Sequence, residues 1–428
     1  MNRMVRDYAA DVLLMVLAGF TAAIAMSAPS PTEAIFADFP QPTSVTLFAV
    51  TTTVVAVFVR KPALSSGLLG LGLALIGVVA LADPWDFDPF VTALGAGLLL
   101  GAAAGLTNGS ERRLRQQGLA AGVVAGLLLT APIEHFRSSA PQRYVEYSPD
   151  AVDPADIFLL CLVALTSAAL LASLQRHRAE PSSPVGDRAR ELTIGIAIAV
   201  AGLLLYESFS SAVMGLNDES FGSHRWVWGL AVVPLLVLFG LWLPGHRGMV
   251  LIAILAFIAA NSSGALREAD SILKLSLVAA LVVAGVVVGR RWPRPLAGVC
   301  ALAVVAATSV LNQPPWDNVN VVAVLVILPF AAAFTVASCL PSSAAVTGTA
   351  LAAPITLSVS LGAVGIAPLV AEFGWTAYAP LTSGKPVWFT DTWQWISMGV
   401  SVGTIALCGL ALAALMRRPS EQPAEPCR

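Results

Sequence analysis

The sequence predicts an all-α protein that crosses a membrane about fourteen times. Hydrophobic residues make up 57% of the 428-residue chain and charged residues only 12%, whereas about 25% of the residues are charged in a typical soluble domain. The mean hydropathy is +0.79. Apolar runs of about 18 residues or more recur along the chain, each bounded by charges, Pro or Trp, and this is the length at which a helix spans the hydrocarbon core.

The expected spans form two series separated by one charge-dense run, RHRAEPSSPVGDRAR, which we predict to be a cytoplasmic linker. The first run is long enough to be a retained helix and not a secretory signal. A late run at 343–370 is rich in Ser, Thr and Pro and predicts either one kinked span or a re-entrant pair. The other spans are expected at 8–27, 43–60, 65–82, 90–107, 117–136 and 156–175, then at 192–213, 226–243, 248–263, 271–289, 296–312, 320–340 and 392–416.

The two series are spaced alike, which predicts an internal repeat. Corresponding spans begin about 180 residues apart through five successive helices, which favours parallel six-plus-six halves. Any close-packed series of spans gives similar spacing, so the alternative that the chain has no internal repeat stays open. The expected domains are an N-terminal six-helix bundle at 1–175, the linker at 176–191, a C-terminal six-helix bundle at 192–340, an additional helix pair at 341–416 and a cytoplasmic tail at 417–428.

The basic residues predict the orientation. With the N-terminus inside and fourteen crossings, most of the 24 Lys and Arg residues fall in inner segments, whereas most loop carboxylates fall outside. The sequence therefore predicts a multi-pass protein of the plasma (inner) membrane with both termini in the cytoplasm. Its Ala- and Val-rich helices, with Arg as the main basic residue, are typical of a high-GC bacterium.

The loops after the second span of each half keep a basic character. They read VRKPALSSG, with Arg60 and Lys61, and LPGHRG, with Arg247. Two parallel six-helix halves joined by a charged linker resemble the major facilitator superfamily, and the resemblance covers residues 8–340. Members usually carry a Gly/Asp/Arg signature in this loop, of which only the basic residues are present here. The resemblance implies a secondary transporter or flippase-like carrier with alternating access between the halves.

Glycines at every fourth position predict close helix packing. Gly97, Gly101 and Gly105 share one face of the fourth expected span, and Gly118, Gly122 and Gly126 share one face of the fifth. Small residues at this spacing let two helix backbones approach each other.

Ionisable residues inside spans are candidate site residues, because they are costly in lipid and normally face a partner or a cavity. Glu207, beside Tyr206, has apolar residues before it and a Ser-rich turn after it, which favours proton binding; the alternative is a carboxylate solvated near the headgroups. Lys274 either snorkels to the interface or pairs with Glu207. Glu134 and His135 form either an interfacial pair or a proton relay.

The inner halves of the spans carry almost no ionisable residue, which favours an apolar or lipid-like substrate. Two alternatives stay open: a non-catalytic scaffold of an envelope assembly complex, and a polyprenyl-phosphate-sugar glycosyltransferase. In the latter, Glu33 or Asp38 would be the catalytic carboxylate and Arg137 or Arg143 would lie near the phosphate. The sequence has no P-loop, no metal-spaced Cys/His cluster and no basic nucleic-acid patch. It therefore predicts membrane lipids as partners and no cofactor, metal, nucleotide or nucleic acid.

Overall fold

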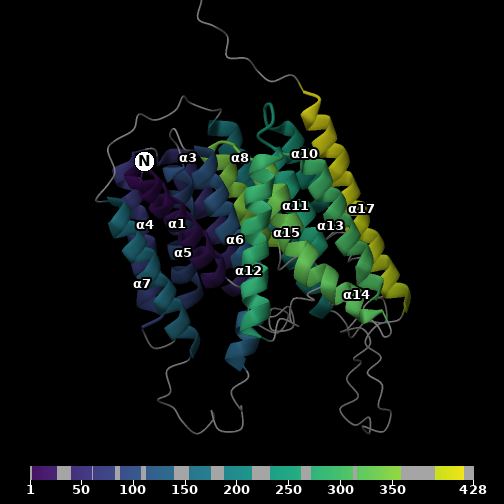
Figure 1. The fold of residues 1–428 in the computed structure, drawn as a ribbon, viewed down its shortest axis with the longest axis horizontal. Helices are drawn as coiled ribbons and strands as arrows, with labels where there is room; N and C mark the ends of the chain where they lie inside the picture. The colour runs from purple at the N-terminus through teal and green to yellow at the C-terminus, as the bar shows by residue number, and fades with distance from the viewer. Residues whose placement is uncertain are drawn as a thin grey trace, which may run out of the picture.

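A computed structural model gives the fold (Figure 1). Every regular element in the residues that it describes is a helix, as the sequence predicts. Helix α1 begins and α17 ends at the same end of the bundle, at the top of Figure 1, and we call this end the termini face. The structure describes residues 2–26, 40–59, 61–81, 87–107, 112–138, 154–174, 188–214, 232–261, 271–311, 316–357 and 391–418.

Six helices form a first group, and they follow the first six expected spans closely. Proline stands in the first turn of α4 and of α5, where its missing N–H costs nothing because that group has no intrahelical partner. The helices of this group are α1 (Asn2–Ala25), α3 (Pro40–Phe58), α4 (Pro62–Val79), α5 (Asp88–Leu106), α6 (Arg112–Ser138) and α7 (Pro154–Leu174).

The remaining helices follow the linker. Helix α12 begins after Ser271, whose side-chain oxygen accepts a hydrogen bond from the backbone N–H of Lys274 at 3.3 Å. Helices α14 and α15 are joined by a π-helical turn, η5, and form one helical stretch. The bounds are α8 (Arg188–Met214), α10 (Val232–Trp242), α11 (Met249–Asn261), α12 (Ile272–Arg291), α13 (Pro295–Thr308), η4 (Ser309–Leu311), α14 (Asp317–Val322), η5 (Ala323–Ile327), α15 (Leu328–Ser338), the helix Ala344–Leu357 and α17 (Asp391–Met416).

Among the described residues, 6 helices are long and apolar enough to cross a membrane, and further apolar helices are shorter. This finding, together with the composition, makes the chain a polytopic membrane protein. The expected number of about fourteen crossings stays a prediction. The helix Ala344–Leu357 covers the first part of the run expected at 343–370, and the rest of that run lies outside the described residues.

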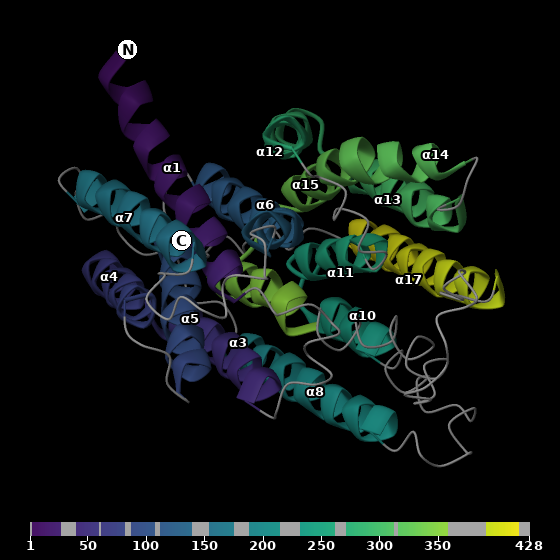
Figure 2. The same cartoon turned by 90° about the horizontal axis from the view of Figure 1, so that it is seen from below.

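The helices pack into two groups with α8 and α10 beside them (Figure 2). In the first group α1 packs along α5, α6 and α7, and α5 packs along α3 and α4. In the second group α11 packs on α13, α15 and α17, while α15 also packs along α12 and α13. Helix α6 joins the groups through α12 and α15, and α8 lies along α3 and touches α10. The helix Ala344–Leu357, yellow-green in Figure 2, lies between the two groups.

The periodic glycines lie at helix contacts, which confirms the packing expected from their spacing. A Cβ atom at Gly101 of α5 would lie 2.7 Å from the carbonyl oxygen of Thr52 on α3, and one at Gly97 would lie 2.9 Å from that of Phe48. Gly118, Gly122 and Gly126 face α1 in the same manner. Backbone-to-backbone approach of this kind needs residues without a side chain.

We predict that Gly101→Val destabilises the protein by about 1–3 kcal/mol, because the added side chain must push α3 and α5 apart. The measurement is the thermal unfolding midpoint in detergent. Gly403→Val on α17 is the matched control, since nothing lies within 4 Å of a Cβ atom at Gly403. Equal midpoints for the two variants would contradict a close α3–α5 contact.

Candidate functional site: a polar seal at the termini face

A cluster of polar side chains joins the two helix groups at the termini face. It connects the start of α6 to the segment 337–347, which ends α15 and opens the helix Ala344–Leu357. Most hydrogen bonds between the groups that the structure describes lie here. We call this cluster the polar seal and define it as Arg112, Gln116, Gln117, Glu191, Arg247, Ser342, Ser343 and Thr347.

Gln116 forms the centre of the polar seal. Its Nε2 atom donates to the carbonyl oxygen of Ser342 at 2.6 Å, and its Oε1 atom accepts from the backbone N–H of Ser342 at 3.0 Å. The side chain is fully buried. A carboxamide that pairs with both backbone groups of one residue satisfies a chain segment that has left the helical hydrogen-bond pattern.

Two neighbours on α6 hold the same segment. Arg112 donates from Nη2 to the carbonyl oxygen of Ser342, and Gln117 donates from Nε2 to that of Ala337 at 3.2 Å. Burial lowers the pKa of the Arg112 guanidinium; nearby Arg247 lowers it further, and Glu191 raises it. Arginine remains protonated after such a shift, so Arg112 brings a positive charge to the seal.

Glu191, near the start of α8, is the acidic member of the polar seal. Its side chain is only 7% exposed, and its Oε1 atom accepts a hydrogen bond from the Ser343 hydroxyl at 2.6 Å. The same oxygen lies 3.4 Å from Nη1 of Arg247. A buried carboxylate needs such partners, because an unpaired buried charge costs several kcal/mol. Glu191 therefore ties α8 and the α10–α11 turn to the segment that Gln116 holds.

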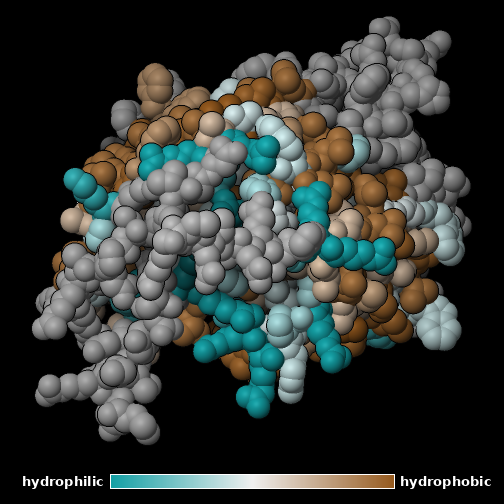
Figure 3. All heavy atoms as spheres, turned by 90° about the horizontal axis from the view of Figure 1, so that it is seen from above, coloured by the Kyte–Doolittle hydropathy of each residue, from teal (hydrophilic) through white to brown (hydrophobic). Residues whose placement is uncertain are grey.

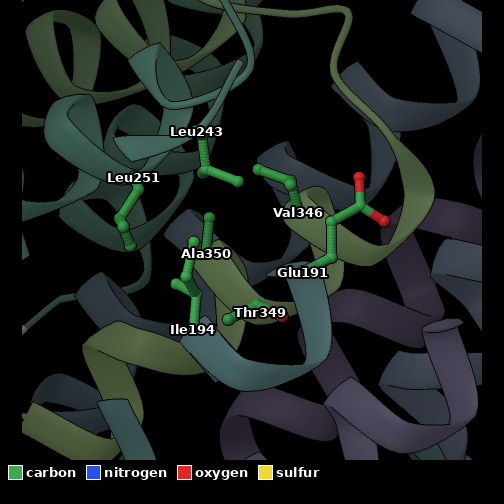
Figure 4. Close-up of a pocket in the computed structure, with 7 residues that line it drawn as sticks. All are labelled: Glu191, Ile194, Leu243, Leu251, Val346, Thr349 and Ala350. Atoms are coloured by element: carbon green, nitrogen blue, oxygen red, sulfur yellow. The ribbon is translucent and has the colours of Figure 1, made fainter. Parts of the chain in front are cut away.

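A small apolar pocket lies beside Glu191 (Figure 4). It has room for about one water molecule. In Figure 4 the carboxylate of Glu191 points away from the apolar side chains of the pocket, toward the partners just described. The pocket is far smaller than a substrate site. The lining residues are Glu191, Ile194, Leu243, Leu251, Val346, Thr349 and Ala350.

Below the polar seal, the helix Ala344–Leu357, which continues the chain from α15, meets the first group through small residues. Gly348, in the helix Ala344–Leu357, packs against Ala56 of α3 and Ala104 of α5, with 3.1 and 3.2 Å from its Cβ position to their side chains. The hydroxyls of Thr53 and Thr349 are 3.2 Å apart. This second contact is close and mainly apolar.

Comparison with known proteins adds information about the fold. No protein-family model matches the sequence, and no curated protein matches it. A solved structure of a double tryptophan mutant of XylE matches with a TM-score of 0.50 at 13% identity, over 99% of this chain and 98% of that chain. XylE is the xylose transporter of E. coli and a major facilitator superfamily protein. The chain has a major-facilitator-like fold. The resemblance expected from the layout is thereby confirmed at the level of the fold.

Two other solved transporters show weaker similarity. PepTSo, a POT family transporter, has a TM-score of 0.49 at 12% identity over 97% of this chain and 99% of its own. FucP, captured in the outward conformation, has a TM-score of 0.45 at 14% identity over 96% of this chain and all of its own.

The structure places most predicted site residues only by their helix. Glu134 and His135 lie in the last turns of α6, and Tyr206 and Glu207 lie in α8, but their side chains are outside the described residues. Lys274 lies in the first turn of α12, with a half-buried side chain. None of the five contributes to the polar seal in the part of the chain that the structure describes, and their roles stay predictions.

The residues proposed for the enzyme alternative are not placed either. Glu33, Asp38 and Arg143 lie outside the described residues, and the side chain of Arg137, near the end of α6, is not described. In the part of the chain that the structure describes, no three His, Cys, Asp or Glu side chains come together to form a possible metal site.

The polar seal was not predicted from the sequence. The sequence assigns Gln116 to the loop before the fifth expected span, Gln117 to the first position of that span and Glu191 to the end of the linker, whereas the structure begins α6 at Arg112 and α8 at Arg188. One feature of the sequence could have indicated the seal: Gln116 and Gln117 lie between Arg115 and an apolar run. Two adjacent carboxamides that become buried there need hydrogen-bond partners elsewhere in the protein.

We predict that Gln116→Leu opens the termini face, since it removes both side-chain bonds to Ser342. Cys339 is only 5% exposed beside the polar seal, so its thiol is shielded from reagents while the seal is closed. The rate of maleimide labelling of Cys339 should rise about tenfold, equivalent to about 1.4 kcal/mol.

The control for this experiment is Thr21→Val, which removes a buried 3.0 Å hydrogen bond to Thr166 inside the first group. It should leave the labelling rate unchanged. Equal rates in wild type and Gln116→Leu would contradict the role of the polar seal. The measurement uses a variant whose other cysteines are replaced: Cys161, Cys300, Cys408 and Cys427.

Proposed function

We propose that this protein is a membrane secondary transporter that works by alternating access between two helix units. The major-facilitator-like fold supports this, and one observation carries it further. Side chains of one helix group hold the backbone of the other group at one end of the molecule, through Gln116 and Gln117 on α6. A joint of this kind closes one end of a central pathway and can be broken without unfolding either unit.

The energy of the polar seal is of the right size for a switch. Each hydrogen bond contributes about 0.5–1.5 kcal/mol net, so the bonds of Arg112, Gln116, Gln117 and Glu191 together contribute several kcal/mol. A change from 1:99 to 99:1 between two states requires about 5.5 kcal/mol of differential binding. A substrate or coupling ion that binds the open state more tightly can therefore shift the equilibrium.

We propose a division of the chain that differs from the one expected from span spacing. The contacts of α11 with α15 and α17 parallel those of α1 with α5 and α7. Likewise, α15 packs on α12 and α13 as α5 packs on α3 and α4. This pattern favours a second unit made of α11, α12, α13, α14–α15, the helix Ala344–Leu357 and α17. Helices α8 and α10 would then be an inserted pair between the units, in place of an additional pair at 341–416.

The placement of charges favours an apolar or amphipathic substrate. Among the charged side chains that the structure describes, all but Asp11 lie within about one turn of a helix end, and Asp11 pairs with Arg115 near the start of α6. The described middle of the bundle is therefore uncharged, which suits a lipid-like or hydrophobic molecule better than a small hydrophilic ion. We also propose that the termini face is cytoplasmic, because Arg residues gather at the helix ends there.

A cross-link across the polar seal tests alternating access. In a cysteine-free background, Gln117→Cys with Ala337→Cys should form a disulfide that stops transport, and reduction should restore it. The pair Asp11→Cys with Arg115→Cys is the control, because these residues form a 2.9 Å ion pair inside the first group. The measurements are leaflet exchange of a short-chain fluorescent phospholipid and vesicle uptake of tetraphenylphosphonium.

Two results would count against the proposal. Transport that continues with the polar seal locked would contradict alternating access through the termini face. If neither probe moves in the reduced protein, the apolar or amphipathic substrate class is wrong.

Proton coupling through Glu207 is a further part of the proposal, resting on its sequence context alone. Glu207→Gln should abolish uptake of tetraphenylphosphonium driven by a pH gradient, because the amide cannot carry the proton, and should leave exchange without a gradient intact. Asp317→Asn, at the start of α14, is the control. Unchanged gradient-driven uptake in Glu207→Gln would remove that role.

A further inference from the structure

The second feature of the termini face is a cluster of arginines around the end of α10. We call it the basic corner and define it as Arg188, Arg190, Trp242, Arg247, Arg417 and Arg418. The residues come from three places in the chain: the start of α8, the end of α10 with the following turn, and the end of α17. Figure 3 views this face, where hydrophilic side chains gather and hydrophobic ones surround them.

Three contacts bring the basic corner together. The guanidinium carbon of Arg190 lies 5.1 Å from the centre of the Trp242 ring. Arg418 donates from Nη1 to the carbonyl oxygen of Leu243 at 3.3 Å. Arg247 lies 3.4 Å from Glu191. The packing of α10 on both α8 and α17 fixes these arginines around one short stretch, 242–247.

The basic corner carries more positive than negative charge. It contains five arginines, and Glu191 is the one carboxylate that an ion pair ties to it among the described residues. Arg188 and Arg417 are exposed, and the Arg247 side chain is 37% exposed. A guanidinium has five N–H donors, so the exposed Arg188 and Arg417 and the partly exposed Arg247 offer several donors at this surface. Such a concentration of donors fits a phosphate group.

The position of Trp242 indicates that the phosphate group belongs to a lipid headgroup. The indole is 47% exposed at the end of α10, and exposed tryptophans at helix ends lie at the level of the lipid headgroups. The arginines therefore lie at headgroup depth, at the side of a helix bundle. Basic pockets between transmembrane helices at this depth bind anionic lipid headgroups.

We propose that the basic corner is a binding site for the phosphodiester of an anionic phospholipid. The lipid bridges α8, α10 and α17 by accepting hydrogen bonds from Arg190, Arg247 and Arg418. It also acts on the polar seal, because Arg247 pairs with Glu191, which holds Ser343. An anionic group beside Arg247 offsets its repulsion with Arg112, so bound lipid stabilises the closed seal.

Quenching of tryptophan fluorescence by brominated lipids tests the site in the full chain. The protein is placed in phosphatidylcholine nanodiscs that contain increasing brominated phosphatidylglycerol or, in a parallel series, brominated phosphatidylcholine. The difference between wild type and Trp242→Phe isolates the signal of Trp242 from the other tryptophans. We expect Trp242 to be quenched at about tenfold lower mole fraction of brominated phosphatidylglycerol than of brominated phosphatidylcholine.

The variants Arg190→Gln and Arg418→Gln should each reduce this preference, and the double variant should abolish it. Arg291→Gln is the matched control, since Arg291 stacks on Trp292 at 5.8 Å at the end of α12, away from α8 and α17. In the protein with Cys339 as its sole cysteine, phosphatidylglycerol should also slow maleimide labelling of Cys339, and adding the double substitution should remove that effect. Arg190→Lys keeps the positive charge and should retain the lipid preference. This result would show that the loss in Arg190→Gln comes from the missing charge and not from misfolding.

Three outcomes would overturn the proposal. Equal quenching of Trp242 by both brominated lipids would remove the preference for an anionic headgroup. An equal effect of Arg291→Gln and Arg190→Gln would show general attraction to the membrane surface and no built site. Release of the quenching by millimolar inorganic phosphate would identify a free anion as the ligand. None of these measurements requires transport, so the lipid site and the proposed transport function can fail separately.

Discussion

Backbone hydrogen bonding is the constraint on which this structure depends. A polar backbone group inside a membrane protein must find its partner in the protein, because hydrocarbon offers none. Helices meet this requirement except where they end. Between α15 and the helix Ala344–Leu357 the chain leaves the helical pattern, and the carbonyls of Ala337 and Ser342 need other partners. Gln116 and Gln117 of the opposite group supply them.

This arrangement makes the joint between the groups specific and suits the reversible opening that the proposed transport cycle requires. The polar seal lies at the end of the bundle, where water can replace Gln116 and Gln117 as hydrogen-bond partners when the groups separate. Opening therefore exchanges protein hydrogen bonds for water hydrogen bonds at modest cost. The Oε1 atom of Gln117 is buried without a hydrogen-bond partner among the described residues. An imperfectly satisfied amide of this kind suits a contact that must open.

The helices and their close contacts were predictable from the sequence, because both depend on local patterns. Apolar runs set the helix positions, and glycines at every fourth position set the faces of α5 and α6 that meet α3 and α1. The polar seal was not predictable in this way. Gln116 and Ser342 are 226 residues apart, and nothing local indicates that they meet.

The division into repeats that we propose differs from the one that span spacing predicts. When successive spans have similar lengths, the distance in sequence between paired spans is nearly constant for any choice of pairing. The spacing predicted a repeat that begins at 192, whereas the contacts of α11, α13, α15 and α17 favour one that begins at α11. Contacts discriminate between these registers because each helix of a bundle touches a characteristic set of neighbours.

Two of the described contacts between the groups, the polar seal and the small-residue contact at Gly348, differ in a way that suits a rocking motion. At the polar seal, Gln116 fixes one residue of the other group through two directional bonds, and a small displacement breaks both. At the second contact, Gly348 packs on Ala56 and Ala104, and a single hydroxyl pair, Thr53 with Thr349, accompanies them. Small apolar surfaces lose little energy when they slide or tilt by a fraction of an ångström, since few directional bonds are at stake. The small-residue contact can therefore act as the pivot and the polar seal as the latch.

Helix α8 touches both: Gly195 of α8 packs against Thr53, and Glu191 one turn earlier binds Ser343. The lipid that we propose to bind at Arg190 would act on the first turn of α8. Because Glu191 lies in the same turn, a shift of this turn would directly change the hydrogen bond between Glu191 and Ser343 in the polar seal.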